Sequence, residues 1–217
     1  MTGRVPRQRL HPDARRKAMI AEALQVLAHE PPEGLTVEGI ARRLGTSPGL
    51  VHRYFGTKDG LVEAALEAAS EELLALLVGD PELPPAKQLT GGLAHYLDYV
   101  TANPVSWSSL IRATGPGAAR IAERVDAHAI AFSLTALTPD VEPPEALQVA
   151  LRGWIALIKD VCWRWLNEGA LDREKVEALL VTAFVGCLQA AAAADPAAQP
   201  ALDAFEGRIH RSNSLKS

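Results

Sequence analysis

The sequence predicts an all-α protein, and three observations support this prediction. Apolar residues recur at the helical spacing of i, i+3, i+4 and i+7 along most of the chain, and no stretch alternates for long enough to form a sheet. Prolines and glycines interrupt this pattern and divide it into separate helices. With 217 residues, of which 48% are hydrophobic, the chain can form a core without metal or disulfide support.

The two ends of the chain differ in charge. Residues 1–60 contain 10 Lys and Arg against 6 Asp and Glu, whereas residues 61–217 contain 12 against 20. Residues 1–11 are predicted to be a flexible basic arm, with Arg4, Arg7 and Arg9. Such arms strengthen binding to nucleic acid, because their cations release counterions from the phosphates. The alternative is a disordered tail that only keeps the protein soluble.

Residues 36–55 have the pattern of two short helices joined by a tight turn. Thr36 can cap the first helix, positions 37, 40, 41 and 44 line its apolar face, and Gly45 follows the last of them. Ser47 can cap the second helix, and Pro48 fits its first turn because the missing N–H would be unpaired there anyway. The pattern therefore predicts a helix-turn-helix.

A third helix begins near Lys58, with Thr57 as its expected N-cap. A cation in the first turn of a helix is disfavoured by the macrodipole, by up to ~1 kcal/mol. A bound phosphate would reverse this preference, because it accepts hydrogen bonds from the free amides and from the lysine together. Lys58 is therefore predicted to hold a phosphate, and the alternative is a solvated surface lysine.

These residues resemble the DNA-binding domain of the tetracycline-repressor (TetR) family. The resemblance covers roughly residues 13–62 and includes Gly45, Gly49, the Tyr54-Phe55 pair, Lys58 and Leu61. It implies an N-terminal three-helix helix-turn-helix domain over residues 12–62 and a C-terminal helical ligand-binding and dimerisation domain over residues 63–195. Residues 196–217 are expected to be a C-terminal tail.

The resemblance also sorts the expected DNA contacts. It implies that Pro48, Leu50 and Arg53 lie near the major groove, and that five residues lie near the sugar-phosphate backbone: Thr36, Ser47, His52, Tyr54 and Lys58. Arg53 can donate two parallel hydrogen bonds to a guanine, whereas Pro48 and Leu50 offer only apolar contact. His52 departs from the family pattern, which usually has tyrosine there. For Leu50 the alternative is core packing, and Phe55 is expected to be a core residue.

The last predicted helices span about residues 144–168 and 172–194, with Gly169 ending one and Asp172 capping the next. This hairpin resembles the family's dimerisation unit. Residues 178–194 carry no charge, and a helix that is apolar all round is either buried or in lipid. The stretch is short and rich in alanine, so we expect a dimer interface at Ala183, Gly186 and Ala190 rather than a membrane anchor.

Aromatic residues gather in the C-terminal part, where the resemblance implies a pocket for an effector. The candidates are Tyr96, Tyr99, Trp107, Ile111, Arg112, His128, Phe132, Trp154, Ile158 and Trp165. Their chemistry suits a small, largely apolar ligand oriented by a few polar groups. The alternative is that these side chains are ordinary core.

Other functional classes find little support. No nucleophile with its base, no paired carboxylates and no phosphate-binding loop are discernible, so no catalytic residue and no cofactor are expected. Cys162 and Cys187 are 25 positions apart, which argues against a metal site and for buried thiols in a reducing compartment. The sequence lacks a secretory signal, so a cytoplasmic, nucleoid-associated protein is expected.

Taken together, these patterns predict a homodimeric transcriptional regulator without a membrane partner. Its partners would be a palindromic double-stranded DNA operator, a second copy of itself and a small apolar effector. Repression relieved by the effector is the favoured function. The alternative is an architectural DNA-binding protein that has no small-molecule effector.

Overall fold

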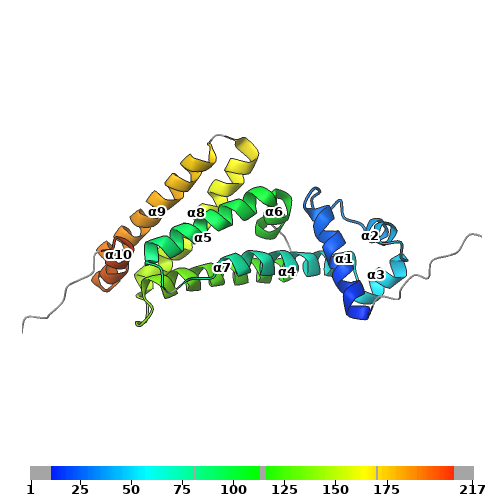
Figure 1. Ribbon diagram of the computed structural model, residues 1–217, viewed down its shortest axis with the longest axis horizontal. Helices are drawn as coiled ribbons and strands as arrows, with labels where there is room; N and C mark the ends of the chain where they lie inside the picture. Colours follow the sequence, from blue (N-terminus) through cyan, green and yellow to red (C-terminus); the bar gives the residue numbers. More distant parts are fainter. Residues whose placement is uncertain (1–10, 81, 113–115, 170, 208–217) are drawn as a thin grey trace, which may run out of the picture.

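The computed structural model describes residues 11–80, 82–112, 116–169 and 171–207, and these form helices without any strand (Figure 1). The all-α prediction is confirmed. The arm residues 1–10 and the tail residues 208–217 lie outside the described part. The helices are α1 (Pro12–Leu27), α2 (Val37–Arg43), α3 (Pro48–Phe55), α4 (Lys58–Leu76), α5 (Pro85–Ala102), α6 (Pro104–Arg112), α7 (Pro116–Leu137), α8 (Glu145–Glu168), α9 (Arg173–Ala194), the 3-10 helix η1 (Pro196–Ala198) and α10 (Gln199–Phe205).

The molecule is elongated, with helices α1 to α3 at one end and α10 near the other (Figure 1). Helix α4 starts inside the first group, where it packs on α1 and α3, and then runs out to pack on α5, α6 and α7. Helices α8 and α9 form an antiparallel hairpin along one side. Helix α4 therefore joins the α1–α3 group to the C-terminal helices.

The three expected N-caps are confirmed. The side-chain oxygens of Thr36, Ser47 and Thr57 accept hydrogen bonds from the amides of Gly39, Leu50 and Gly60, at 3.1, 3.3 and 3.0 Å. Gly45 has a φ of 60°, a left-handed conformation that ends α2 without a Cβ clash. Short-range chemistry thus sets the ends of α2, α3 and α4.

The sharp turn from α3 into α4 depends on two glycines that the sequence analysis did not single out. Gly56 has a φ of 74°, which only glycine adopts readily. A Cβ built on Gly60 would lie 2.3 Å from the Phe55 carbonyl oxygen, so α4 can approach the end of α3 only without a side chain there. This close approach brings the start of α4 beside the end of α3.

The structure differs from the sequence prediction after residue 195. Residues 196–205, expected to belong to the tail, form η1 and α10, which pack on α5, α7 and α9. Pro196 and Pro200 both stand in first turns, where proline is tolerated. Ala198, Ala201 and Leu202 are buried, and the ring of Phe205 lies 5.0 Å from that of Phe184. Tertiary packing therefore stabilises a helix that is too short to be stable alone.

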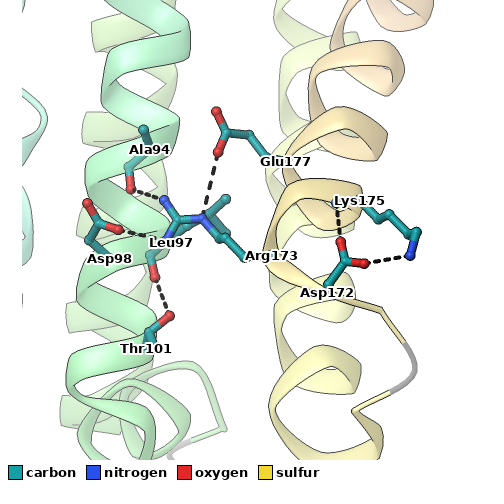
Figure 2. Close-up of polar contacts among 8 residues, drawn as sticks. All are labelled: Ala94, Leu97, Asp98, Thr101, Asp172, Arg173, Lys175 and Glu177. Atoms are coloured by element: carbon teal, nitrogen blue, oxygen red, sulfur yellow. Dashed lines mark hydrogen bonds and ion pairs between the residues drawn. The ribbon is translucent and has the colours of Figure 1, made fainter.

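Arg173 connects the start of α9 to α5 (Figure 2). Its guanidinium donates to the Asp98 carboxylate at 2.6 Å and to the Ala94 carbonyl at 3.0 Å, and Glu177 lies on its other side at 3.7 Å. Beside it, Asp172 caps α9 by accepting from the Lys175 amide at 2.9 Å, as expected. The contacts of Arg173 hold the α8–α9 hairpin against α5.

Candidate DNA interface and effector cavity

The exposed face of α3 is short and carries one permanently charged side chain, Arg53. Pro48, Gly49, His52 and Arg53 are exposed, whereas Val51 is fully buried beneath them. This spacing of i, i+1, i+4 and i+5 is one side of a helix. Among the described residues no hydrogen bond or ion pair engages Arg53. Its guanidinium is therefore free to donate outward.

Leu50, Tyr54 and Phe55 lie between this face and the core. All three are partly buried and pack against core residues. For Leu50 this is close to the core-packing alternative, because only part of its side chain is left for a base. Phe55 is not the fully buried residue that the sequence suggested. Its ring lies 5.4 Å from the Arg16 guanidinium carbon, which holds it at the surface between α1 and α3.

Two of the expected backbone contacts are hydroxyls already used as caps. Thr36 and Ser47 are exposed, and each accepts an amide hydrogen with its oxygen. A hydroxyl that accepts one hydrogen bond can still donate its own proton. Both residues are thus able to cap a helix and donate to a phosphate at the same time.

Lys58 has a partner within the protein. Its Nζ donates to the carbonyl oxygen of Glu33, in the loop between α1 and α2, at 2.9 Å. An ammonium has three donors, so two remain for a phosphate. The contact holds the cation at the N-terminus of α4, where the helix amides also favour an anion.

His52 is oriented by its own helix end. Its Nδ1 lies 3.0 Å from the Gly56 carbonyl oxygen, which can only accept a hydrogen bond, so Nδ1 carries the proton. In the neutral ring Nε2 is then a bare acceptor. It can donate to a phosphate only after a second proton is bound.

An apolar cavity of about 60 Å³ lies among α4, α5, α6, α7 and α8. Half of the proposed effector residues line it: Tyr96, Ile111, Phe132, Trp154 and Ile158. They are joined by residues that the sequence did not predict, including Leu73 of α4 and its C-cap Leu77. Their periodic apolar spacing looks like that of any core residue, so the sequence held no signal for them.

The other five proposed effector residues do not line this cavity. Tyr99 and Trp107 are buried. The Tyr99 hydroxyl donates to the Ala69 carbonyl at 3.1 Å. His128 lies 3.2 Å from the Leu77 carbonyl oxygen, and Arg112 stacks 3.4 Å from the ring centre of Trp163. Trp165 is a partly buried residue packed against the core. Burial raises the pKa of Tyr99 to about 12.

The polar groups of the cavity come from three helices. Lys159 of α8 donates to Asp126 of α7 at 2.5 Å, and both line the cavity. The Trp107 indole donates to the Tyr96 hydroxyl at 2.9 Å. Burial raises the pKa of the Tyr96 phenol well above its usual value, and Cys162 and Asp126 raise it further. The phenol therefore remains a neutral hydrogen-bond donor.

The proposed dimer residues lie on the outer side of α9. Gly186 and Ala190 are exposed and Ala183 is partly buried, whereas Phe184 and Leu188 point into the core. By length and composition, α9 alone among the described helices could cross a membrane, and 28% of its apolar window is buried. Most of this apolar surface is left for something outside the chain to cover.

Two family models match the chain. The model of "Bacterial regulatory proteins, tetR family" matches residues 19–65, and that of "Tetracyclin repressor-like, C-terminal domain" matches residues 85–187. The chain belongs to the TetR family. The matched segments hold the helix-turn-helix and the cavity walls formed by α5 to α8. As a TetR-family protein it is a DNA-binding regulator of transcription.

Individual relatives agree with the family assignment. The HTH-type transcriptional regulator BetI of Rhizobium meliloti is 41% identical over 54 residues, 25% of this chain and 27% of that protein. The BetI regulator of Burkholderia thailandensis is 28% identical over 169 residues, 73% of this chain and 83% of that protein. The crystal structure of a TetR-family transcriptional regulator from Streptomyces coelicolor has a TM-score of 0.84 and 27% identity, over 92% of this chain and 91% of that one.

Proposed function

We propose that this TetR-family protein is a homodimeric repressor that releases a palindromic operator when a small, largely apolar effector enters the cavity. One observation supports this most directly: a single helix belongs to both sites. The N-cap Thr57 and the first residue Lys58 of α4 stand at the DNA-binding end, and Leu73 near its other end and the C-cap Leu77 line the cavity. A displacement of α4 at the cavity would therefore move the group of helices α1 to α3, of which α1 and α3 pack on α4.

The size of the cavity makes such a displacement necessary. Pockets for drug-sized ligands are typically about 300–1,000 Å³, whereas this cavity is about 60 Å³. Any larger occupant has to separate the helices. Arg124 of α7 donates to the Glu67 carboxylate and, at 2.6 Å, to the Ser70 hydroxyl, both on α4. Separation of α7 would therefore carry α4 with it.

A dimer turns this displacement into a change of DNA affinity. The outer faces of α8 and α9 expose Val149, Leu157 and Leu179, and we propose that a second copy covers them, with Ala183, Gly186 and Ala190 at the contact. The two α3 helices of such a dimer can then bind half-sites ~34–36 Å apart only while the DNA-binding domains keep that spacing. An effector that binds more tightly to a dimer conformation with a different spacing releases the DNA by linkage.

Operator binding with and without candidate effectors tests the proposal. Fluorescence anisotropy would follow binding to the DNA upstream of the protein's own gene, before and after addition of metabolite extracts. We expect at least one extract to lower the affinity. Ala129→Leu, which fills the cavity, should change this response, whereas Ala127→Leu on the exposed side of α7 should not. Operator binding that no extract alters would favour an architectural role instead.

A further inference from the structure

The cavity has one uncharged hydrogen-bond donor that no described residue uses. The Tyr96 hydroxyl accepts from the Trp107 indole at 2.9 Å, and no described group accepts the Tyr96 proton. The side chain is strongly desolvated, yet part of it remains accessible because it lines the cavity. A phenol has one proton to donate, so a buried phenol that only accepts is left unsatisfied. An occupant of the cavity would be the acceptor that it lacks.

The two charged side chains that line the cavity form an ion pair with each other. Asp126 and Lys159 are paired at 2.5 Å, and they are the only ionisable Asp, Glu, Lys or Arg side chains among its lining residues. An anionic ligand would meet Asp126, and a cationic ligand would have to displace Lys159 from it. Either ion would lose its hydration without gaining an unpaired counter-ion, which is costly in an apolar site.

We propose that the effector is a neutral, mainly apolar molecule with one hydrogen-bond acceptor, such as a ketone or ester oxygen, that binds the Tyr96 hydroxyl. This inference rests on the proposed function, because it names the class of ligand for the same cavity. The apolar part lies against the side chains of Leu73, Phe132 and Ile158. The acceptor lies at the Tyr96 end, where the Trp107 bond orients the phenol and strengthens it as a donor.

Four probes of nearly equal shape distinguish the chemical classes. Acetophenone carries the acceptor, α-methylstyrene replaces its oxygen with CH₂, benzoate is an anion and 1-phenylethylammonium is a cation. Calorimetry on the full chain should show acetophenone binding about 3- to 10-fold more tightly than α-methylstyrene, as one neutral hydrogen bond predicts. The two ions should bind more weakly than acetophenone. Tighter binding of either ion, or binding of none of the four probes, would overturn the inference.

A matched pair of variants assigns the preference to one hydroxyl. Tyr96→Phe should bring the ratio of the two neutral affinities to about one while leaving the α-methylstyrene affinity unchanged. Tyr99→Phe removes a hydroxyl from the same helix that donates to Ala69 and lies outside the cavity, so it should keep the preference. An unchanged ratio in Tyr96→Phe contradicts the assignment.

A measurement on the unmodified protein covers the case in which Tyr96→Phe does not fold. In ¹H–¹⁵N spectra, acetophenone should shift the Trp107 indole signal downfield, because a phenol that donates becomes a better acceptor. α-Methylstyrene should not shift it downfield, and equal shifts with both probes would contradict the proposal. A ketone that binds with this signature but leaves operator affinity unchanged would instead refute the effector function and leave the ligand class intact.

Discussion

The outer face of α3 offers few groups that can distinguish one base pair from another. Of its exposed residues, Pro48 and Gly49 have no side-chain donor, and the His52 ring is held by the Gly56 carbonyl. Arg53 remains as the group with paired donors, the arrangement that recognises a guanine edge. We therefore propose that base recognition is concentrated in Arg53 and that contacts to the phosphates supply most of the affinity.

Lys58→Ala should weaken binding to all DNA sequences alike. The lysine stands at the N-terminus of α4, where a phosphate contact carries no base information. Its loss should make the dependence of log affinity on log salt shallower by about one unit. Anisotropy over a salt series with cognate and scrambled duplexes measures this. A loss restricted to the cognate duplex would contradict the phosphate assignment.

Arg53→Ala should have the opposite signature. Loss of a bidentate contact costs ~1–3 kcal/mol of discrimination at one base position, while much of the non-specific affinity remains. Competition with duplexes that each carry one altered base pair locates the position. If affinity for cognate and scrambled DNA fell equally, Arg53 would be a backbone contact.

At the scale of single elements, α9 has two faces with different tasks. Val176, Leu180, Phe184 and Leu188 recur on the inner face and are buried within the chain. The outer face consists mostly of small residues, which allow another helix backbone to approach closely. The inner face stabilises the monomer, and the outer face is available to a partner.

Gly186→Leu should weaken the dimer without unfolding the monomer. A Cβ built on Gly186 meets no atom of its own chain within 4 Å, so a larger side chain disturbs only a neighbour. Overfilling a packed contact typically costs ~1–3 kcal/mol. Gly91→Leu on α5, where a Cβ likewise meets nothing within 4 Å, is the control. Sedimentation should show dissociation for Gly186→Leu alone, and an unaltered dimer would place the interface elsewhere.

For the whole molecule, four weak acids whose pKa values are raised should make folding sensitive to alkali. Burial raises the pKa values of Tyr99 and Cys162 to about 12, and those of Tyr96 and Cys187 are also raised. In the unfolded chain, cysteine and tyrosine lose their protons near pH 8.5 and 10. The folded state therefore binds more protons above about pH 8.5, and its stability falls as the pH rises.

Urea unfolding between pH 8 and 11 measures this loss. A well-buried group such as Cys162 contributes about 1.4 kcal/mol per pH unit between its unfolded and folded pKa values. Cys162→Ala should lower stability near pH 8, because a buried side chain is shortened, but it should reduce the slope above pH 9, because one titrating group is gone. A slope equal to that of the unmodified protein would show that Cys162 ionises as easily in the folded state as in the unfolded one.

What the sequence determined by itself is the local structure of the DNA-binding end and the family. Thr36, Ser47 and Thr57 cap their helices through bonds to amides three residues away, so the ends of those helices depend on neighbours in the chain. The helical spacing and the turn at Gly45 are equally local. Residues 196–205 were missed because their helices depend on packing against distant helices.

Only the tertiary structure decided which C-terminal residues form the cavity. Tyr96, Asp126 and Lys159 come from α5, α7 and α8, and nothing in their spacing shows that they meet. Tyr99 and Trp107 are aromatic like several cavity residues, but the Tyr99 hydroxyl donates to the Ala69 carbonyl and Trp107 is buried in the core. An apolar helical stripe looks the same whether it faces a core or a cavity, because both exclude water. The packing of five helices makes that distinction.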